Sequence, residues 1–194
     1  MEITAIEPRR KRLSQLYLDG EAAVKVDTET LLKSRWKPGM EISDEELHQL
    51  LQESEARRAK EKALYLLEYR SHSKKELADK ISRTTSREAA EAAVEKMEEL
   101  GLMNDEAYAR QLAEVLLGKK GYGVRRARQE LLQKGIDREL TEELLEEMAP
   151  DPEEKLREIV ERKYRKNLGD EKGYRRTVAA LQRLGYGWED IKTV

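Results

Sequence analysis

The stretch from Lys120 to Ile136 reads KGYGVRRARQELLQKGI, and the stretch from Glu171 to Gly187 repeats its pattern as EKGYRRTVAALQRLGYG. In both, a glycine opens a helix-like run (Gly123, Gly173), two arginines follow, and a second glycine closes the run. About fifty residues before the first stretch, SHSKKELADKISRTT has Ser73, Lys75 and Ile81 at the positions that correspond to Gly123, Arg125 and Leu131. The sequence therefore predicts one helix that is repeated three times.

The composition favours helices over a deep globular core. Charged residues make up 40 % of the 194 residues, aromatic residues only 5 %, and phenylalanine is absent. Helix-forming residues dominate. Glycine and proline interrupt the pattern too often for a sustained coiled coil. We expect an all-α protein, an elongated array in which each helical unit buries its apolar face on its neighbour.

Local signals divide the chain into four parts. Near the N-terminus, Asp19-Gly20 separates two strand-like runs, which predicts a β-hairpin, and Asp27 is placed to cap a short helix after it. Three tandem three-helix repeats should follow this small extension. The predicted bounds are 1–43 for the extension and 44–104, 105–150 and 151–194 for the repeats.

Other helix starts carry capping signals. Ser43 and Ser73 are each followed three residues later by a glutamate, the pattern of a capping box. Thr85 is expected to begin the next helix, and Asn104 precedes an acidic first turn. Two sets of apolar residues recur in the repeats and predict core positions: Ile81, Leu131 and Leu181, and Val94, Leu144 and Val194.

The residues offer no catalytic constellation. There is no cysteine, and the two histidines, His48 and His72, are isolated residues that we expect on exposed helical surface. The run GKKGYG lacks the hydroxyl and the spacing of a phosphate-binding loop. We therefore expect neither enzymatic activity nor a metal or cofactor. No apolar run approaches membrane-spanning length, and a monomeric cytoplasmic protein is the expectation.

Basic residues recur on the repeated helix, although the net charge is −2, from 38 basic and 40 acidic residues. On a helical wheel, Arg125 and Arg126 point away from the apolar arc. Arg128 instead falls inside that arc, and we predict that it meets a carboxylate of a neighbouring helix. The alternative is three solvated helices with ordinary surface charge. The partner-binding candidates are Lys75, Lys119, Lys120, Arg125, Arg126, Arg128, Arg175 and Arg176.

Three motifs stand out along the chain: ALYLLEYRSHSKKELADKI from Ala63, LMNDEAYARQLAEVLL from Leu102 and ARQELLQKGI from Ala127. Together they resemble the RecX family of bacterial recombination regulators. The resemblance covers nearly the whole chain and is weaker in the third repeat. Tyr108 stands where phenylalanine is common in the family, and SRTTS after Ile81 replaces a usual Lys-Gly-aromatic turn.

The resemblance implies a non-enzymatic regulator that acts in recombination, DNA repair and the SOS response. Such a protein binds the filament of RecA recombinase on single-stranded DNA, modulates and mostly inhibits its ATPase and strand exchange, and binds single-stranded DNA weakly. In this interpretation the Asn-Asp-Glu and Tyr-Arg motifs serve capping and packing. The alternative is an autonomous nucleic-acid-binding helical repeat protein. The near-zero net charge favours the filament regulator.

Overall fold

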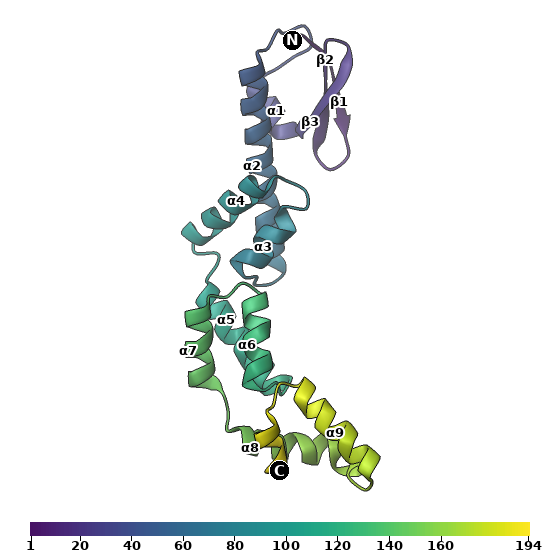
Figure 1. Cartoon of the computed structure of the whole chain (residues 1–194). Helices are drawn as coiled ribbons and strands as arrows, with labels where there is room; N and C mark the ends of the chain where they lie inside the picture. The colour runs from purple at the N-terminus through teal and green to yellow at the C-terminus, as the bar shows by residue number, and fades with distance from the viewer. The chain divides into compact units, whose positions relative to one another are not determined.

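The computed structural model describes residues 1–194 and divides into two compact units, Met1–Met103 and Asn104–Val194. Unit 1 contains a small antiparallel sheet and the first group of three helices, and unit 2 contains the second and third groups (Figure 1). The predicted class, three tandem three-helix repeats after a small β-containing extension, is confirmed. The predicted bounds of the four parts stay a prediction.

The N-terminal sheet has three strands, β1 (Ile3–Arg9), β2 (Leu13–Leu18) and β3 (Glu21–Asp27), in the order β1-β2-β3. The predicted hairpin is the β2–β3 pair, closed by Asp19 and Gly20 at φ of 51° and 89°. These residue types tolerate positive φ, so the turn forms with little strain. β1 adds a third strand by pairing antiparallel to β2.

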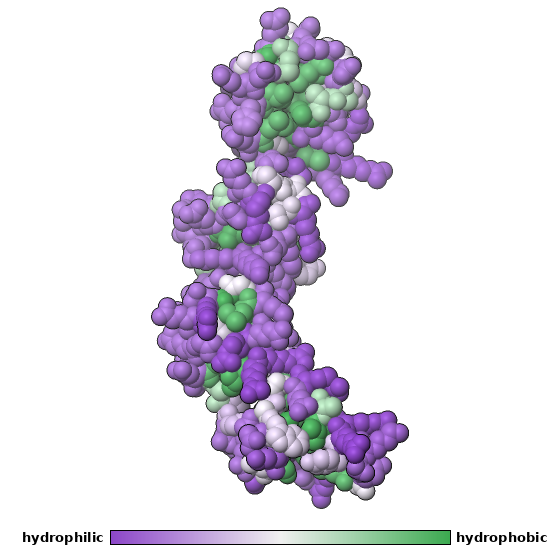
Figure 2. Space-filling model, viewed as in Figure 1, coloured by the Kyte–Doolittle hydropathy of each residue, from purple (hydrophilic) through white to green (hydrophobic).

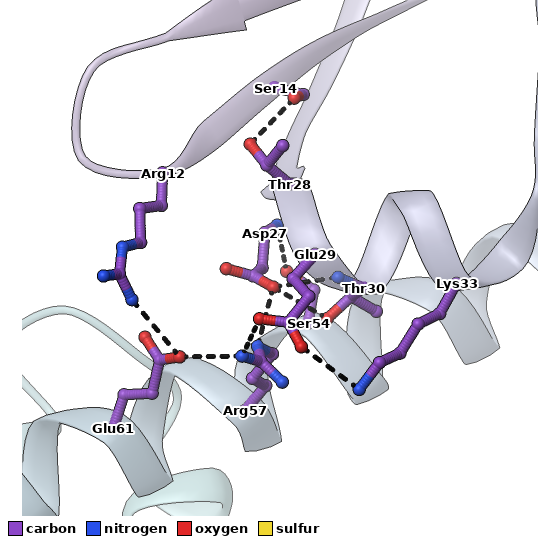
Figure 3. A network of polar contacts seen from close by, with 10 residues as sticks. All are labelled: Arg12, Ser14, Asp27, Thr28, Glu29, Thr30, Lys33, Ser54, Arg57 and Glu61. Carbon is purple, nitrogen blue, oxygen red and sulfur yellow. Dashed lines mark hydrogen bonds and ion pairs between the residues drawn. The ribbon is translucent and has the colours of Figure 1, made fainter.

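Two helices pack against this sheet. Asp27 caps α1 (Thr28–Ser34), and Ser43 and Glu46 form a capping box at the start of α2 (Asp44–Tyr69), both as predicted. The buried Asp27 also lies 3.1 Å from Nε of Arg57 on α2 (Figure 3). The apolar core beneath consists of Ile3, Leu16, Leu18, Val26, Leu31, Ile42 and Leu50.

The long helix α2 buries different faces along its length. Its first half packs Leu47, Leu50 and Leu51 toward the sheet, whereas its second half buries Ala59 and Ala63 against the following helices. At 3.6 residues per turn, these two faces lie roughly 150° apart around the helix. One continuous helix can therefore hold the sheet on one side and the first helical group on another.

The first helical group adds α3 (Lys74–Ile81) and α4 (Arg87–Glu99) to α2. The prediction that Thr85 starts the third helix is wrong by one residue, because Ser86 accepts the backbone hydrogen bond of Ala89. The Thr85 hydroxyl instead lies 3.2 Å from the Ile81 carbonyl, to which it donates.

The second group comprises α5 (Asp105–Glu114), α6 (Val124–Gln133) and α7 (Arg138–Met148). Asn104 caps α5 as predicted, and a π-helical turn, η1 (Val115–Lys119), extends that helix. The core of this group includes Leu116, Leu131, Leu144 and Leu145.

The third group comprises α8 (Pro152–Ile159), the turns η2 (Val160–Tyr164) and η3 (Arg165–Asn167), α9 (Glu171–Arg183) and α10 (Trp188–Lys192). The expectation that Gly173 opens its second helix is wrong. Asp170 caps α9 by accepting from the Gly173 N–H, which puts that glycine inside the first turn.

One set of predicted core positions is confirmed and the other only in part. Ile81, Leu131 and Leu181 are all buried. Val94 and Leu144 are buried too, but Val194 is 43 % exposed because it follows the end of α10. Ile191 is the residue of α10 that the core buries. Figure 2 shows a mostly hydrophilic surface, with apolar side chains gathered over the N-terminal sheet.

Candidate partner-binding groove

Two Gly-Tyr-Gly segments, residues 121–123 and 185–187, join the second and third helical groups inside unit 2. The Gly123 N–H donates to the Leu184 carbonyl at 2.8 Å, and the Tyr186 hydroxyl donates to the Gly121 carbonyl at 3.2 Å. Gly185 has a φ of 96°, and a Cβ there would lie 2.7 Å from the Arg126 nitrogen. Glycine is needed at this position for both reasons.

This contact places the start of α6 beside the end of α9. Arg126 Nη1 donates to the Arg183 carbonyl at 2.6 Å, and the Arg126 guanidinium lies 4.2 Å from the centre of the Tyr122 ring. Glu130, one turn further along α6, is 3.8 Å from Arg126 Nε. Arg126 is therefore fixed by neighbours on both helical groups.

A groove of about 600 Å³ opens between these elements. It is lined chiefly by Arg125, Arg126, Gln129, Gln182, Arg183 and Trp188. Arg125 is exposed and makes no hydrogen bond or ion pair, so its charge is available to a partner. The Trp188 side chain is 50 % exposed at the same groove. Cationic, amide and aromatic groups together suit an anionic partner surface or a phosphate backbone.

The other predicted basic residues of unit 2 lie elsewhere. Arg175 and Arg176 line a separate depression of about 350 Å³ on α9, where Arg175 donates to Glu171 at 2.6 Å. Lys119 and Lys120 are exposed at the end of η1, and Lys120 Nζ lies 5.3 Å from the Tyr122 ring centre. Lys75 is exposed on α3 in unit 1. The structure thus brings Arg125 and Arg126 together with Arg183, and not with Arg175.

Arg128 meets a carboxylate of the neighbouring helix, as predicted. Its Nε and Nη2 donate to the two oxygens of Glu142 on α7, both at 2.7 Å. These hydrogen bonds hold the pKa of Glu142 below its ordinary value. The pair connects α6 to α7, so the Arg128 charge is already used inside the second helical group.

Sequence reasoning missed Arg183, Trp188 and the glutamines of the groove. Gln182 and Arg183 lie at the end of the third copy of the repeated helix, Trp188 lies in the short tail after it, and Gln129 lies within the second copy. None of them is among the basic residues that recur on the repeated helix. The available signals were the tryptophan in the charged tail GWEDIKTV and the second Gly-Tyr-Gly segment.

The histidine expectation is wrong for His72, whose exposed fraction is only 4 %. Its Nδ1 lies 2.8 Å from the Arg70 carbonyl and its Nε2 lies 2.9 Å from Lys80 Nζ. Since lysine donates and the carbonyl accepts, His72 is neutral with its proton on Nδ1. Burial lowers the pKa of His72 below its ordinary value.

Other classes of site find no support in the described residues 1–194. Nowhere do three or more histidine or acidic side chains gather so that they could hold a metal ion. No helix combines the length and the apolar character needed to cross a membrane.

Three family models match this arrangement in succession. They describe the first, second and third three-helix domains of RecX and match residues 59–97, 104–145 and 151–194. The chain belongs to the RecX family. The resemblance seen in the three motifs is therefore confirmed, and RecX proteins are regulatory proteins and not enzymes.

Relatives agree with this assignment, and a solved structure agrees with the fold. The regulatory protein RecX of Caldanaerobacter subterraneus subsp. tengcongensis is 36 % identical over 167 residues, covering 84 % of each chain. That of Clostridioides difficile is 26 % identical and covers 99 % of this chain and 93 % of its own. A crystal structure of a regulatory protein RecX superposes with a TM-score of 0.64 at 23 % identity, covering 100 % of this chain and 99 % of its own.

The structure divides the Tyr-Arg motif of this RecX protein into two roles. Arg70 Nη2 donates to Glu76 at 2.6 Å, which joins the end of α2 to α3 and serves packing as expected. Tyr69, in contrast, is 82 % exposed, so the packing role expected for it is wrong.

Proposed function

We propose that this RecX protein binds the RecA filament on single-stranded DNA and modulates, chiefly by inhibition, its ATPase and strand-exchange activities. The observation that carries the proposal is the groove of unit 2, where Arg125 and Arg183 stand beside Trp188 in a chain of RecX type. The filament presents acidic side chains and phosphates, which guanidinium groups recognise through charge-assisted hydrogen bonds. Such a filament forms in the bacterial cytoplasm, where the proposal places the protein.

The balance of charge supports a filament over free DNA as the main partner. The chain carries a net charge of −2, and its acidic residues pair with many of its arginines, Arg128 and Arg175 among them. Affinity for naked DNA depends on neutralised phosphates and falls steeply with salt. A local basic groove on a nearly neutral protein should therefore bind a composite surface of protein and DNA more tightly than it binds naked DNA.

The experiment compares two double variants in a titration of RecA ATPase inhibition at two salt concentrations. Arg125→Ala with Arg183→Ala removes two of the three cations of the groove and keeps Arg126, which already contacts Glu130. Arg175→Ala with Arg176→Ala removes the same charge from the separate depression. We expect the groove variant to inhibit about tenfold less well, as for two interface contacts of roughly 1 kcal/mol each with partial coupling. The depression variant should lose less.

Two results would contradict the assignment. If the groove variant inhibits as well as the parent at both salt concentrations, the groove is a solvated surface. If the parent and the groove variant both bind naked single-stranded DNA as tightly as they bind the RecA-coated strand, the alternative of an autonomous nucleic-acid-binding protein is correct.

A further inference from the structure

The longest basic run of the chain is Arg9 to Arg12, in which Arg9 ends β1 and the other three residues form the loop between β1 and β2. Lys11 and Arg12 are held at φ of 62° and 57°, a region that side chains with a Cβ adopt reluctantly. The β2–β3 turn of the same sheet has Asp19 and Gly20 at its positive-φ positions. The basic loop therefore accepts strain that asparagine and glycine would relieve, and strain of this kind is typical of functional sites.

This loop lies beside the middle of α2. Arg12 Nη1 is 3.8 Å from Glu61 Oε1 (Figure 3). The Glu61 carboxylate also accepts from Arg57 at 2.9 Å, but Arg57 is shared with Asp27 and Glu29, so Arg12 supplies part of the charge that balances Glu61. The positive charge of Arg10 and Lys11 thus faces solvent next to α2, and both side chains are exposed.

From this point α2 presents a stripe formed by Arg58, Lys62, Tyr65 and Tyr69. These four residues fall within about 60° of arc, on the face with which the first half of the helix holds the sheet. Beyond the sheet that face is open, and Tyr65 and Tyr69 are 55 % and 82 % exposed. Arg58 donates to the Thr84 carbonyl, which leaves Lys62 as the cation among the aromatic rings.

The two tyrosines form one aromatic surface. Their ring centres are 6.0 Å apart with the planes tilted by 49°, and Lys62 Nζ lies 5.2 Å from the centre of the Tyr65 ring. Exposed neighbouring aromatic rings beside cations are the features with which proteins bind single strands, because bases stack on the rings while cations contact phosphates.

We propose that the β1–β2 loop and the α2 stripe form a site for single-stranded nucleic acid. Phosphates lie against Arg10, Lys11 and Arg12, and bases stack on Tyr65 and Tyr69. An acidic protein segment would engage the cations but would leave the aromatic surface without a role. The site belongs to unit 1 and is independent of the groove of unit 2 and of RecA.

The test measures binding of the full chain to a fluorescent single-stranded oligothymidine, without RecA, over a range of salt concentrations. Lys11→Asn with Arg12→Gly removes two charges and also relieves two positive-φ positions. The double variant should bind at least tenfold more weakly at low salt, and the salt slope should become shallower by about 1.4. Its thermal midpoint should rise, so the lost binding cannot be attributed to unfolding.

The matched control is Arg35→Gly with Lys37→Asn. Arg35 has a φ of 61° at the C-terminal end of α1. This control removes the same charge and relieves one strained position, and it should bind like the parent. If the control and the loop variant lose oligothymidine binding equally, the loss is a general effect of net charge and the proposal is overturned.

The aromatic half is tested separately. Tyr69→Ala should weaken oligothymidine binding by about tenfold, whereas Tyr69→Trp should retain it, as expected for base stacking. Unchanged binding of Tyr69→Ala would overturn the proposal, as would displacement of the oligonucleotide by polyglutamate as effectively as by unlabelled DNA. None of these measurements depends on RecA, so this proposal can fail while the proposed function holds, and the reverse.

Discussion

Arg128 on α6 and Glu142 on α7 form a two-pronged ion pair, with both nitrogen–oxygen distances at 2.7 Å. Arg128 lies where an apolar side chain would be expected on its helix, and Glu142 is the partner that makes this position possible. The Arg128 side chain is 38 % exposed, and its length lets the head reach the carboxylate of the next helix from an apolar position.

This ion pair predicts an acid-dependent loss of stability. Its hydrogen bonds lower the pKa of Glu142 in the folded protein, so the stabilisation is present above the carboxyl's ordinary pKa of 4.5 and is lost as pH falls through the folded value. Glu142→Gln should therefore lose less thermal stability than the parent between pH 6 and about pH 3. Glu143→Gln, on the same helix and outside any ion pair, should lose as much as the parent. An unchanged acid profile of Glu142→Gln would contradict the prediction.

His72 predicts a second pH effect at milder acidity. Burial lowers its folded pKa, and the unfolded chain therefore takes up a proton first as pH falls below 6.5. Arg70 and Lys80 oppose a charge on the ring, and Glu76 favours it. The free energy of unfolding should decrease below pH 6.5, and His72→Gln should show a flatter profile there. Denaturant titrations at pH 7.5 and 5.5 check this; an identical pH dependence in both proteins would count against it.

Asn104 caps α5 by accepting from the Ala107 N–H at 2.9 Å. Asn104→Ala should lower the free energy of unfolding by about 1 kcal/mol, while Asn104→Asp, which keeps the acceptor, should stay close to the parent. Denaturant unfolding gives both values. Because the role is local, inhibition of RecA by the alanine variant should be unchanged under conditions where it is folded. A stable alanine variant that fails to inhibit would refute the structural role.

Gly185 predicts a larger effect. A Cβ at this position would approach Arg126 Cβ to 2.6 Å, and the backbone φ of 96° is strained for any other residue. Gly185→Ala should destabilise unit 2 by roughly 1–3 kcal/mol and should raise amide hydrogen exchange in α9 and α10. Gly169→Ala is the control, because its Cβ would meet nothing within 4 Å. Equal exchange in the two variants would mean that the Gly-Tyr-Gly contact does not hold the groups together.

Sequence alone was sufficient where the deciding interaction is local. The caps at Asp27, Ser43 and Asn104 each depend on a side chain that accepts from a backbone N–H three residues later. The Asp19-Gly20 turn depends on two adjacent φ angles. The three repeats could be predicted for a similar reason, since Ile81, Leu131 and Leu181 recur at a fixed spacing and are all buried.

Tertiary structure alone decided which basic residues share a surface. The Arg126–Arg183 hydrogen bond joins residues 57 apart, and it exists because Gly185 lets two backbones approach closely. The buried His72 ring contacts the Arg70 carbonyl and Lys80 Nζ, which no periodicity in the sequence predicts. The exposure of Tyr69 depends on α2 changing its buried face midway. A helical wheel assigns each helix one apolar face, but the faces that remain open are fixed only when every neighbouring element has packed. The sequence therefore determined the helices, their ends and their repeats, and packing between distant segments decided the groove and the aromatic stripe.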